Sequence, residues 1–224
     1  MVSQLSSPQR FEKVSLRDQV SRALRAAIVS GELEPGEIYS APALGSRFGV
    51  SATPVREAML DLVRENLVET VPNKGYRVTE IKDEDLDHVT ELRMLIEPPL
   101  AGQVTAHVPE SDFPVLRAAA QLIVDGAEAG DLVAYTESDR QFHLKLLAYT
   151  GNPRVTALIA ELRGQTRLFG LASLLERGEL VDSAQEHHAI LDAVEARDAE
   201  RVESLMRDHI RQTRGRWAHP DHDQ

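Results

Sequence analysis

The stretch that decides the fold is residues 48–59, which read Phe-Gly-Val-Ser-Ala-Thr-Pro-Val-Arg-Glu-Ala-Met. Gly49 ends one short helical pattern, and Ser51 is a residue type that caps the next helix. Pro54 falls in the first turn of that helix, where its missing N–H costs nothing. Val55 then begins an apolar stripe at helical spacing. The stretch therefore predicts two short helices joined by a tight turn.

The flanking residues extend this pair to a three-helix unit with a hairpin. An earlier helical pattern ends at Gly31, Ser40 can cap the second helix, and the turn Pro72-Asn-Lys-Gly75 joins two strand-like pieces. The expected elements are helices beginning at Leu16, Ala41 and Ser51 and strands at 67–71 and 75–79. Three helices followed by a hairpin is the order of a winged helix-turn-helix. We expect this domain over residues 13–80, after a flexible arm at 1–12.

The third helix carries the residues expected to contact DNA. A helix-turn-helix lays its second helix in the major groove and contacts bases near that helix's N-terminus. Ser51 and Thr53 can hydrogen-bond to phosphate, and Arg56, one turn further, can reach a guanine edge with a bidentate fork. The alternative is that Arg56 only pairs on the surface with Glu57 or Asp61. The order of the elements favours DNA binding.

The expected wing adds three candidate DNA-binding residues, Lys74, Gly75 and Arg77, which can meet phosphate or the minor groove. The net charge of −11 does not contradict this interpretation. Residues 1–80 hold ten Lys/Arg and ten Asp/Glu, whereas residues 81–224 hold fifteen and twenty-six. The whole negative excess therefore lies outside the DNA-binding unit, which needs positive charge on one face only.

Composition limits the class of protein. The chain has 224 residues, of which 42% are hydrophobic but only 4% aromatic, and it has no cysteine. Ala and Leu dominate the apolar set, which favours helices packed on helices. The lack of cysteine removes disulfide and thiolate chemistry. No apolar run approaches the roughly 18 residues of a membrane span, so we expect no membrane partner and a cytoplasmic protein.

The second half of the chain reads as helix throughout and predicts an antiparallel bundle over residues 81–216. Pro98-Pro99 interrupts the first helix and is expected to kink it. The tail at 217–224 is expected to be disordered. The six expected helices are 83–107, 112–129, 131–149, 153–177, 183–196 and 198–216. The predicted fold class is thus mainly α, a winged helix-turn-helix followed by a bundle of about six helices.

Four residues of this bundle form a candidate metal site. Asp139 and His143 are spaced i, i+4 and therefore share one face of a helix. His187 and His209 are symmetric about residue 198, where a turn is expected, so an antiparallel hairpin sets them at the same height. Three imidazoles and a carboxylate suit Zn²⁺ first, and also Ni²⁺, Mn²⁺, Co²⁺ or Fe²⁺. The alternative is half-buried core histidines and a surface Asp139.

The remaining histidines are not expected to be ligands. His188 follows His187 directly and points about 100° away on a helix. The others have no partner at useful spacing and are His88, His107, His219 and His222.

Residues 16–79 resemble the DNA-binding domain of the GntR family of transcription regulators. The motif that carries the resemblance runs from Phe48 to Met59, through Leu62 and Asn66-Leu67-Val68, to Pro72-Asn-Lys-Gly-Tyr-Arg-Val78. The family often has arginine where this chain has Pro42 and Ala52. These two departures remove base or phosphate contacts and change the expected operator sequence.

Residues 83–214 resemble the FCD-type ligand-binding domain of the FadR subfamily, in its shorter VanR-like branch. The marks of this resemblance are Leu92-Arg93 with Glu97, Asp139-Arg-Gln-Phe-His143, Gly151-Asn152, Glu186-His187-His-Ala-Ile190 and Met206-Arg-Asp-His209-Ile. The resemblance implies metal ligands at the same four positions and a small organic acid whose carboxylate completes the metal sphere. Arg93 matches a position facing the effector, and Arg163 and Arg167 are further candidates.

The resemblance implies a homodimer that binds an inverted-repeat operator and is not an enzyme. Release of the operator when the acid binds makes it a repressor, and activation is the alternative sign of regulation. Two alternatives remain open. The metal site of a metalloenzyme would activate water, with Glu97 or Glu186 as the only nearby bases. In the second alternative, the metal is purely structural and no effector exists.

Overall fold

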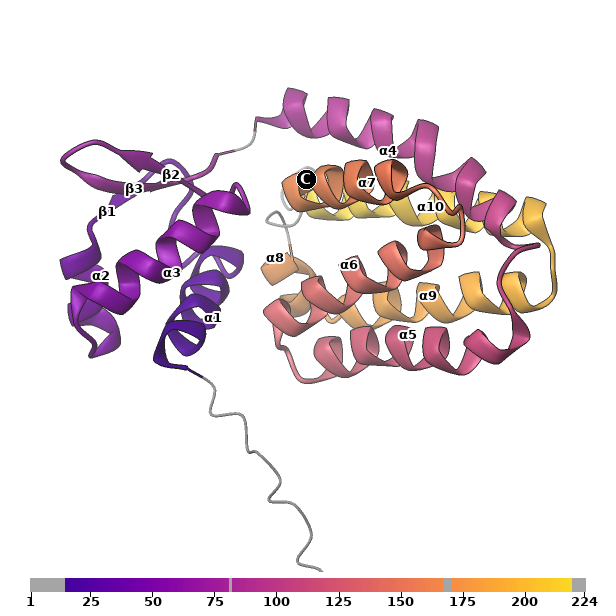
Figure 1. Cartoon of the computed structure of the whole chain (residues 1–224), viewed down its shortest axis with the longest axis horizontal. Coiled ribbons are helices and arrows are strands. Elements are labelled where there is room, and N and C mark those ends of the chain that lie inside the picture. Colours follow the sequence, from indigo (N-terminus) through magenta and orange to yellow (C-terminus); the bar gives the residue numbers. More distant parts are fainter. Residues whose placement is uncertain (1–14, 81, 167–170, 219–224) are drawn as a thin grey trace, which may run out of the picture.

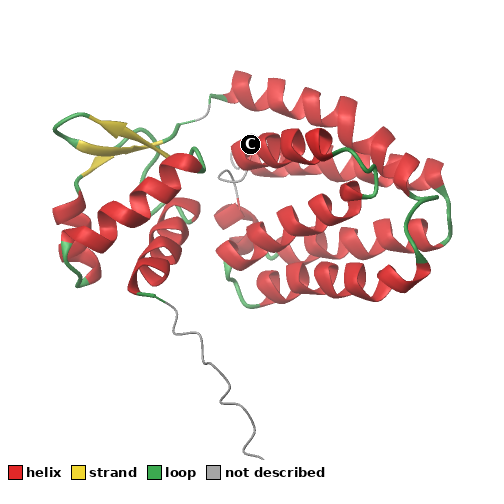
Figure 2. Cartoon of the chain, viewed as in Figure 1, coloured by secondary structure: helices red, strands yellow, loops and turns green. Residues whose placement is uncertain are grey.

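The computed structural model describes residues 15–80, 82–166 and 171–218. It has two parts, which Figure 1 shows side by side: residues 15–80, here called the head, and residues 82–218, here called the bundle. The small sheet lies in the head and the bundle is helical (Figure 2). The fold class predicted from the sequence is confirmed. The expected arm at 1–12 and the end of the expected tail, 219–224, lie outside the described residues.

The head has the predicted order of elements: α1 (Leu16–Val29), β1 (Ile38–Tyr39), α2 (Ala41–Phe48), α3 (Ala52–Arg64), β2 (Val68–Val71) and β3 (Gly75–Val78). Ser40 caps α2 as expected, since its side chain accepts from the backbone N–H of Ala43 at 3.3 Å. Gly49 ends α2 in the left-handed region, with φ 68°. Ser51 occupies the N-cap of α3, but its side chain makes no capping hydrogen bond. The expectation that its hydroxyl caps this helix was therefore wrong.

The wing is a three-stranded antiparallel sheet in the order β1-β3-β2. The sequence did not predict β1, because two residues carry no alternating pattern. In the register, Tyr39 pairs with Tyr76. A Cβ on Gly75 would lie 2.3 Å from the carbonyl oxygen of Tyr39, and Gly75 has φ 140°. Glycine is therefore required at this position for β1 to join the wing.

The bundle contains α4 (Asp83–Val104), a 3₁₀ turn η1 (Glu110–Asp112), α5 (Phe113–Glu128), α6 (Leu132–Ala148), α7 (Pro153–Thr166), α8 (Leu171–Glu176), α9 (Leu180–Glu195) and α10 (Ala199–Ala218). Within the expected helix 153–177 the structure describes α7 and α8, and residues 167–170 between them lie outside the described residues. Pro98 and Pro99 do not interrupt α4, which continues through both.

The bundle helices pack in a ring around one apolar core. α5 packs against α6 and α9, α10 against α9 and α4, and α7 closes the ring against α4 and α6. Large side chains such as Tyr135, Phe142 and Leu146 are completely buried in this core. Since α6, α9 and α10 all contribute buried faces, polar side chains on those faces are brought together inside the bundle. Within the described residues, no helix has the length and apolar character needed to cross a membrane.

The head touches the bundle through α1 and α6, which lie next to each other in Figure 1. Arg22 of α1 bonds to Asp131, the N-cap residue of α6, at 2.6 Å. Val29, the last residue of α1, is buried and belongs to the apolar core of the bundle. A groove of about 810 Å³ runs between the two parts, lined by Arg25 and Arg64 from the head and by Glu137 from α6, among others.

Candidate functional site

The first candidate surface is the N-terminal end of α3. Ser51, Thr53 and Arg56 are all exposed there, as a DNA-contacting helix requires. Among the described residues, Arg56 has no ion-pair partner. Asp61, the partner proposed in the alternative interpretation, instead binds Arg17 from α1 at 2.5 Å and Arg64 at 2.7 Å. The Arg17 contact holds the pKa of Asp61 below its usual value. Asp61 is thus engaged by two other arginines, and Arg56 lies exposed near the start of α3.

The wing carries the second group of predicted DNA-binding residues. Lys74 is exposed at its tip, and Gly75 is the residue that lets β1 pack beside β3. Arg77 is paired with Glu69 across the hairpin at 2.5 Å. A phosphate that binds Arg77 must therefore compete with this exposed ion pair, which is a weak competitor.

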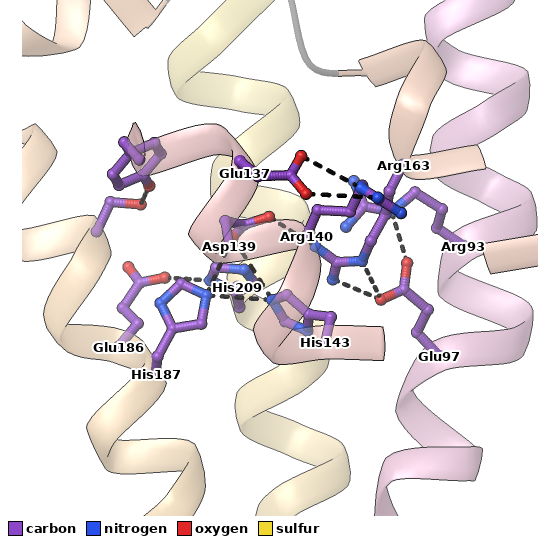
Figure 3. Close-up of polar contacts among 12 residues, drawn as sticks. Arg93, Glu97, Glu137, Asp139, Arg140, His143, Arg163, Glu186, His187 and His209 are labelled. Atoms are coloured by element: carbon purple, nitrogen blue, oxygen red, sulfur yellow. Dashed lines mark hydrogen bonds and ion pairs between the residues drawn. The ribbon is translucent and has the colours of Figure 1, made fainter. Parts of the chain in front are cut away.

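Inside the bundle, the four predicted metal ligands meet (Figure 3). One ligand atom from each of Asp139, His143, His187 and His209 lies within 4.8 Å of all the others. Nε2 of His187 is 3.1 Å from Nε2 of His143 and 3.1 Å from Oδ1 of Asp139. Oδ1 of Asp139 is 3.6 Å from Nε2 of His143. The ring centroids of His187 and His209 are 4.7 Å apart, as the antiparallel hairpin of α9 and α10 predicts.

Hydrogen bonds fix the tautomers of two of these histidines. Nδ1 of His187 lies 3.0 Å from the carbonyl oxygen of Ala184, and Nδ1 of His209 lies 2.7 Å from a carboxylate oxygen of Glu186. Both oxygens only accept, so each Nδ1 carries the proton. The Nε2 lone pairs of both rings then point inward. Histidines that bind metals donate their other ring N–H to a carbonyl or carboxylate oxygen, as His187 and His209 do here.

The donor set fits a divalent cation. Two atoms bound at about 2.1 Å to one tetrahedral ion lie roughly 3.4 Å apart. The separations of 3.1 and 3.6 Å among Asp139, His143 and His187 bracket this value. Of the three inward-facing histidine nitrogens and the Asp139 oxygen, at most the nitrogen of His143 carries a proton. The lone pairs of the other atoms face one another, and this arrangement is favourable only with a cation between them. The set matches the chemistry of Zn²⁺ and related divalent ions.

Burial and charge keep these groups in the protonation states that bind a cation. Burial, followed by the nearby guanidinium of Arg163, holds the pKa of His143 well below its usual value. Burial also lowers the pKa of His209, so both imidazoles are neutral near pH 7. Burial raises the pKa of Asp139, but Arg163 and the histidine contacts outweigh it and hold that pKa well below its usual range. The site therefore presents neutral imidazoles at His143 and His209 and a carboxylate at Asp139.

Beside the ligand set lies a buried ion-pair network. Arg93 and Arg163, two of the predicted effector-binding residues, both contact Glu97, which is fully buried. Nε of Arg93 lies 2.7 Å from Glu97, and NH2 of Arg163 lies 2.5 Å from it. NH1 of Arg163 also reaches Oδ2 of Asp139 at 3.0 Å. Arg167, the third predicted effector residue, lies outside the described residues.

Sequence reasoning missed the roles of two carboxylates in this site. The sequence offered Glu97 and Glu186 as marks of the family resemblance and as bases of a rival enzyme, whereas the first holds two arginines and the second orients His209. One signal was available, because Glu97 follows Arg93 at the i, i+4 spacing of a helical ion pair. The contacts of Arg163 with Glu97 and with Asp139 join different helices and leave no local pattern.

A winged helix-turn-helix head on a helical bundle with a buried polar site defines a DNA-binding transcription regulator. Comparison with protein families agrees with this class. The family described as "Bacterial regulatory proteins, gntR family" matches residues 16–78, and the FCD domain matches residues 88–212. The chain therefore belongs to the GntR family of regulators with an FCD domain.

Individual relatives match along most of the chain. The HTH-type transcriptional regulator McbR of Escherichia coli strain K12 is 27% identical over 193 residues, covering 85% of this chain and 87% of McbR. The HTH-type transcriptional repressor GlaR of the same strain is 29% identical over 203 residues, covering 84% of this chain and 90% of GlaR. The solved structure of E. coli McbR/YncC superposes with a TM-score of 0.66 at 27% identity, covering 89% of this chain and 95% of that one.

Proposed function

We propose that this regulator is a metabolite-responsive repressor that senses a small organic acid at a metal-containing site in its bundle. The observation that carries the proposal is the buried convergence of Asp139, His143, His187 and His209, whose ligand atoms lie within 4.8 Å of one another. A purely structural core does not need three inward imidazoles and a carboxylate in one place, since unpaired buried polar groups are costly. The relative GlaR is a transcriptional repressor, which supports the sign of regulation.

In this proposal the four side chains hold one divalent ion, Zn²⁺ or another of the ions named above. When bound, the ion supplies a positive charge that a ligand carboxylate can coordinate. Arg93 and Arg163 add the charge that recognises an acid, because guanidinium groups pair with carboxylates in a bidentate fork. Arg167 remains a third candidate by its resemblance to the family.

We further propose that the regulator is a homodimer on an inverted-repeat operator, since two heads match a two-fold symmetric site. Leucines on two adjacent helices support a pairing face. Leu92 and Leu95 of α4 are 46% and 67% exposed, and Leu158 of α7 is 43% exposed. α4 and α7 pack together along one edge of the bundle (Figure 1). A Leu95→Asp variant should therefore sediment as a monomer and bind the operator more weakly.

The route from site to head runs through α6. This helix carries Asp139 and His143 on one side, and its N-cap residue Asp131 bonds to Arg22 of the head. A change in how the site holds α6 therefore changes the surface on which the head rests. Operator affinity falls if the acid-bound arrangement disfavours the spacing of the two heads that fits DNA.

The direct test is fluorescence anisotropy of labelled operator DNA titrated with the full chain. Arg56→Ala removes the exposed guanidinium at the start of α3 and should weaken specific binding by about 1–3 kcal/mol. Arg154→Ala is the matched control, since that exposed arginine lies on α7 of the bundle. Unchanged operator binding by Arg56→Ala would contradict the assignment of α3 as the base-contacting helix.

Two measurements separate this function from its rivals. An enzyme would consume an added carboxylic acid, whereas a regulator returns it unchanged, which chromatography of the mixture decides. If the metal is only structural, its removal melts the bundle and no acid shifts the melting temperature of the loaded protein.

A further inference from the structure

We propose that Glu97 is a built-in competitor of the effector: its carboxylate holds Arg93 and Arg163 in the ligand-free protein, and a small dicarboxylic acid displaces it on binding. This inference rests on the proposed function and names the class of its ligand. It concerns the arginine side of the site, next to the candidate metal ligands but separate from them.

The contacts show that Glu97 already makes the bonds expected of a bound acid. Its Oε1 accepts from Nε of Arg93 at 2.7 Å, and its Oε2 accepts from Nε and NH2 of Arg163 at 2.9 and 2.5 Å. All three side chains are nearly or completely buried, with exposures of 3%, 0% and 3% for Arg93, Glu97 and Arg163. A ligand carboxylate that binds these guanidinium groups through the same nitrogen atoms would take the place of Glu97.

The charge of the cluster decides which ligand can make this exchange. Burial raises the pKa of Glu97, but Arg163 and Arg93 outweigh it and lower that pKa to about 2, so Glu97 is a carboxylate. With Asp139, the four charged groups balance to zero, and a divalent ion beside them leaves a positive excess. A monocarboxylate at the ion leaves Glu97 in place. A dicarboxylate can supply a second carboxylate in exchange for it.

The geometry gives such a ligand two adjacent anchoring points. One guanidinium, that of Arg163, contacts both Glu97 and Asp139, at 2.5 and 3.0 Å. A single guanidinium group thus bridges the carboxylate of Glu97 and that of Asp139, the candidate metal ligand. In this proposal, one carboxylate of a small diacid binds the ion and the other binds the arginines.

Helix α4 lacks backbone hydrogen bonds next to Glu97, which favours movement of this residue. Pro98 and Pro99 follow it directly and have no N–H, so α4 lacks two of its internal hydrogen bonds at this point. The backbone is therefore more easily bent here than in an uninterrupted helix. Because α4 is the element that follows the head along the chain, movement of Glu97 is transmitted toward the head.

The test is isothermal titration of the full chain, loaded with Zn²⁺, with succinate and separately with acetate. Glu97→Gln keeps the size of the side chain and removes its charge. It should bind succinate about tenfold more tightly than the unmodified chain does, with acetate affinity changed by about twofold or less. Glu91→Gln is the matched control, since this exposed glutamate lies on the same helix and its loss removes the same charge.

Glu97→Asp provides a second variant that keeps the charge in case Glu97→Gln does not fold. Its side chain is one methylene shorter and cannot hold both arginines as well, so it should also tighten succinate binding, by a smaller factor. Succinate affinity equal to or below that of the unmodified chain in the folded variant overturns the inference while leaving acid sensing intact. If every protein binds Zn²⁺ but none binds either acid, the proposed function fails and the inference fails with it.

Discussion

Replacing His187 with Gln should abolish the stabilisation of this regulator by Zn²⁺. The His187 side chain is completely buried, and its Nε2 lies 3.1 Å from both Nε2 of His143 and Oδ1 of Asp139. Gln is of similar size and keeps an amide that can bond to Ala184, but it removes the central nitrogen of the donor set. The substitution therefore tests the cation site with limited disturbance to the core.

The magnitude follows from the linkage between binding and folding. An ion that binds only the folded state stabilises it by about 2.7 kcal/mol when present at a hundred times its dissociation constant. For a chain of about 150–250 residues, each kcal/mol corresponds to roughly 2–4 °C in melting temperature. The unmodified protein should therefore melt about 5–11 °C higher with Zn²⁺ than with a chelator.

The assay is thermal melting followed by circular dichroism, in buffered Zn²⁺ and in chelator. His187→Gln should show a difference of less than about 2 °C between the two conditions. His188→Gln is the matched control, because the neighbouring residue on α9 points about 100° away from the site. A Zn²⁺-dependent shift of equal size in His187→Gln and in the unmodified chain would refute the argument, as would its absence from both.

Three further outcomes can be checked. In chelator, the free energy of unfolding should fall as pH drops below about 6.5, the pKa of an unfolded histidine. The unfolded chain then binds protons that the buried His143 and His209 do not bind, because their pKa values are lowered in the folded state. Urea unfolding should show a loss of up to roughly 1.4 kcal/mol per pH unit for each of these residues. Gly75→Ala should cost about 2 kcal/mol or more in unfolding free energy, because its Cβ would overlap the backbone of β1. Arg22→Ala breaks the exposed ion pair with Asp131. In the absence of effector, it should change operator affinity by no more than a few-fold, and it should reduce the response to the effector, as anisotropy titrations can measure.

The parts of the fold that sequence reasoning predicted are those set by local chemistry. Gly49 ends α2 and Ser40 caps it because backbone conformation and capping depend on adjacent residues. Strand β1 was missed because two residues give no period, and its pairing depends on a close approach to Gly75 from elsewhere in the chain.

The candidate site likewise has contacts that the sequence predicted and contacts that it did not. Asp139 and His143 share a helix face, and His187 and His209 are symmetric about a turn, so geometry along the chain predicted each pair. The structure brings the two pairs together. The bonds from Arg163 of α7 to Glu97 of α4 and to Asp139 of α6 cross between helices, at sequence separations of 66 and 24 residues. Nothing in a single sequence specifies which buried arginine meets which carboxylate, because that choice depends on how α4, α6 and α7 pack.

The contact between head and bundle must use more than its one ion pair if the site is to control DNA binding. Coupling between two sites in a protein is typically about 1–3 kcal/mol, whereas an exposed pair such as Arg22–Asp131, with side chains 63% and 37% exposed, contributes about 1 kcal/mol or less. The larger share therefore falls to the apolar contact, in which Val29 at the end of α1 is buried in the core of the bundle. Since that core is continuous with the face of α6 next to Asp139 and His143, a shift of α6 changes the packing around Val29 directly. Truncating Val29 to Ala should accordingly weaken the coupling between effector and operator more than loss of Arg22 does, and equal coupling in the two variants would show that the apolar contact does not carry it.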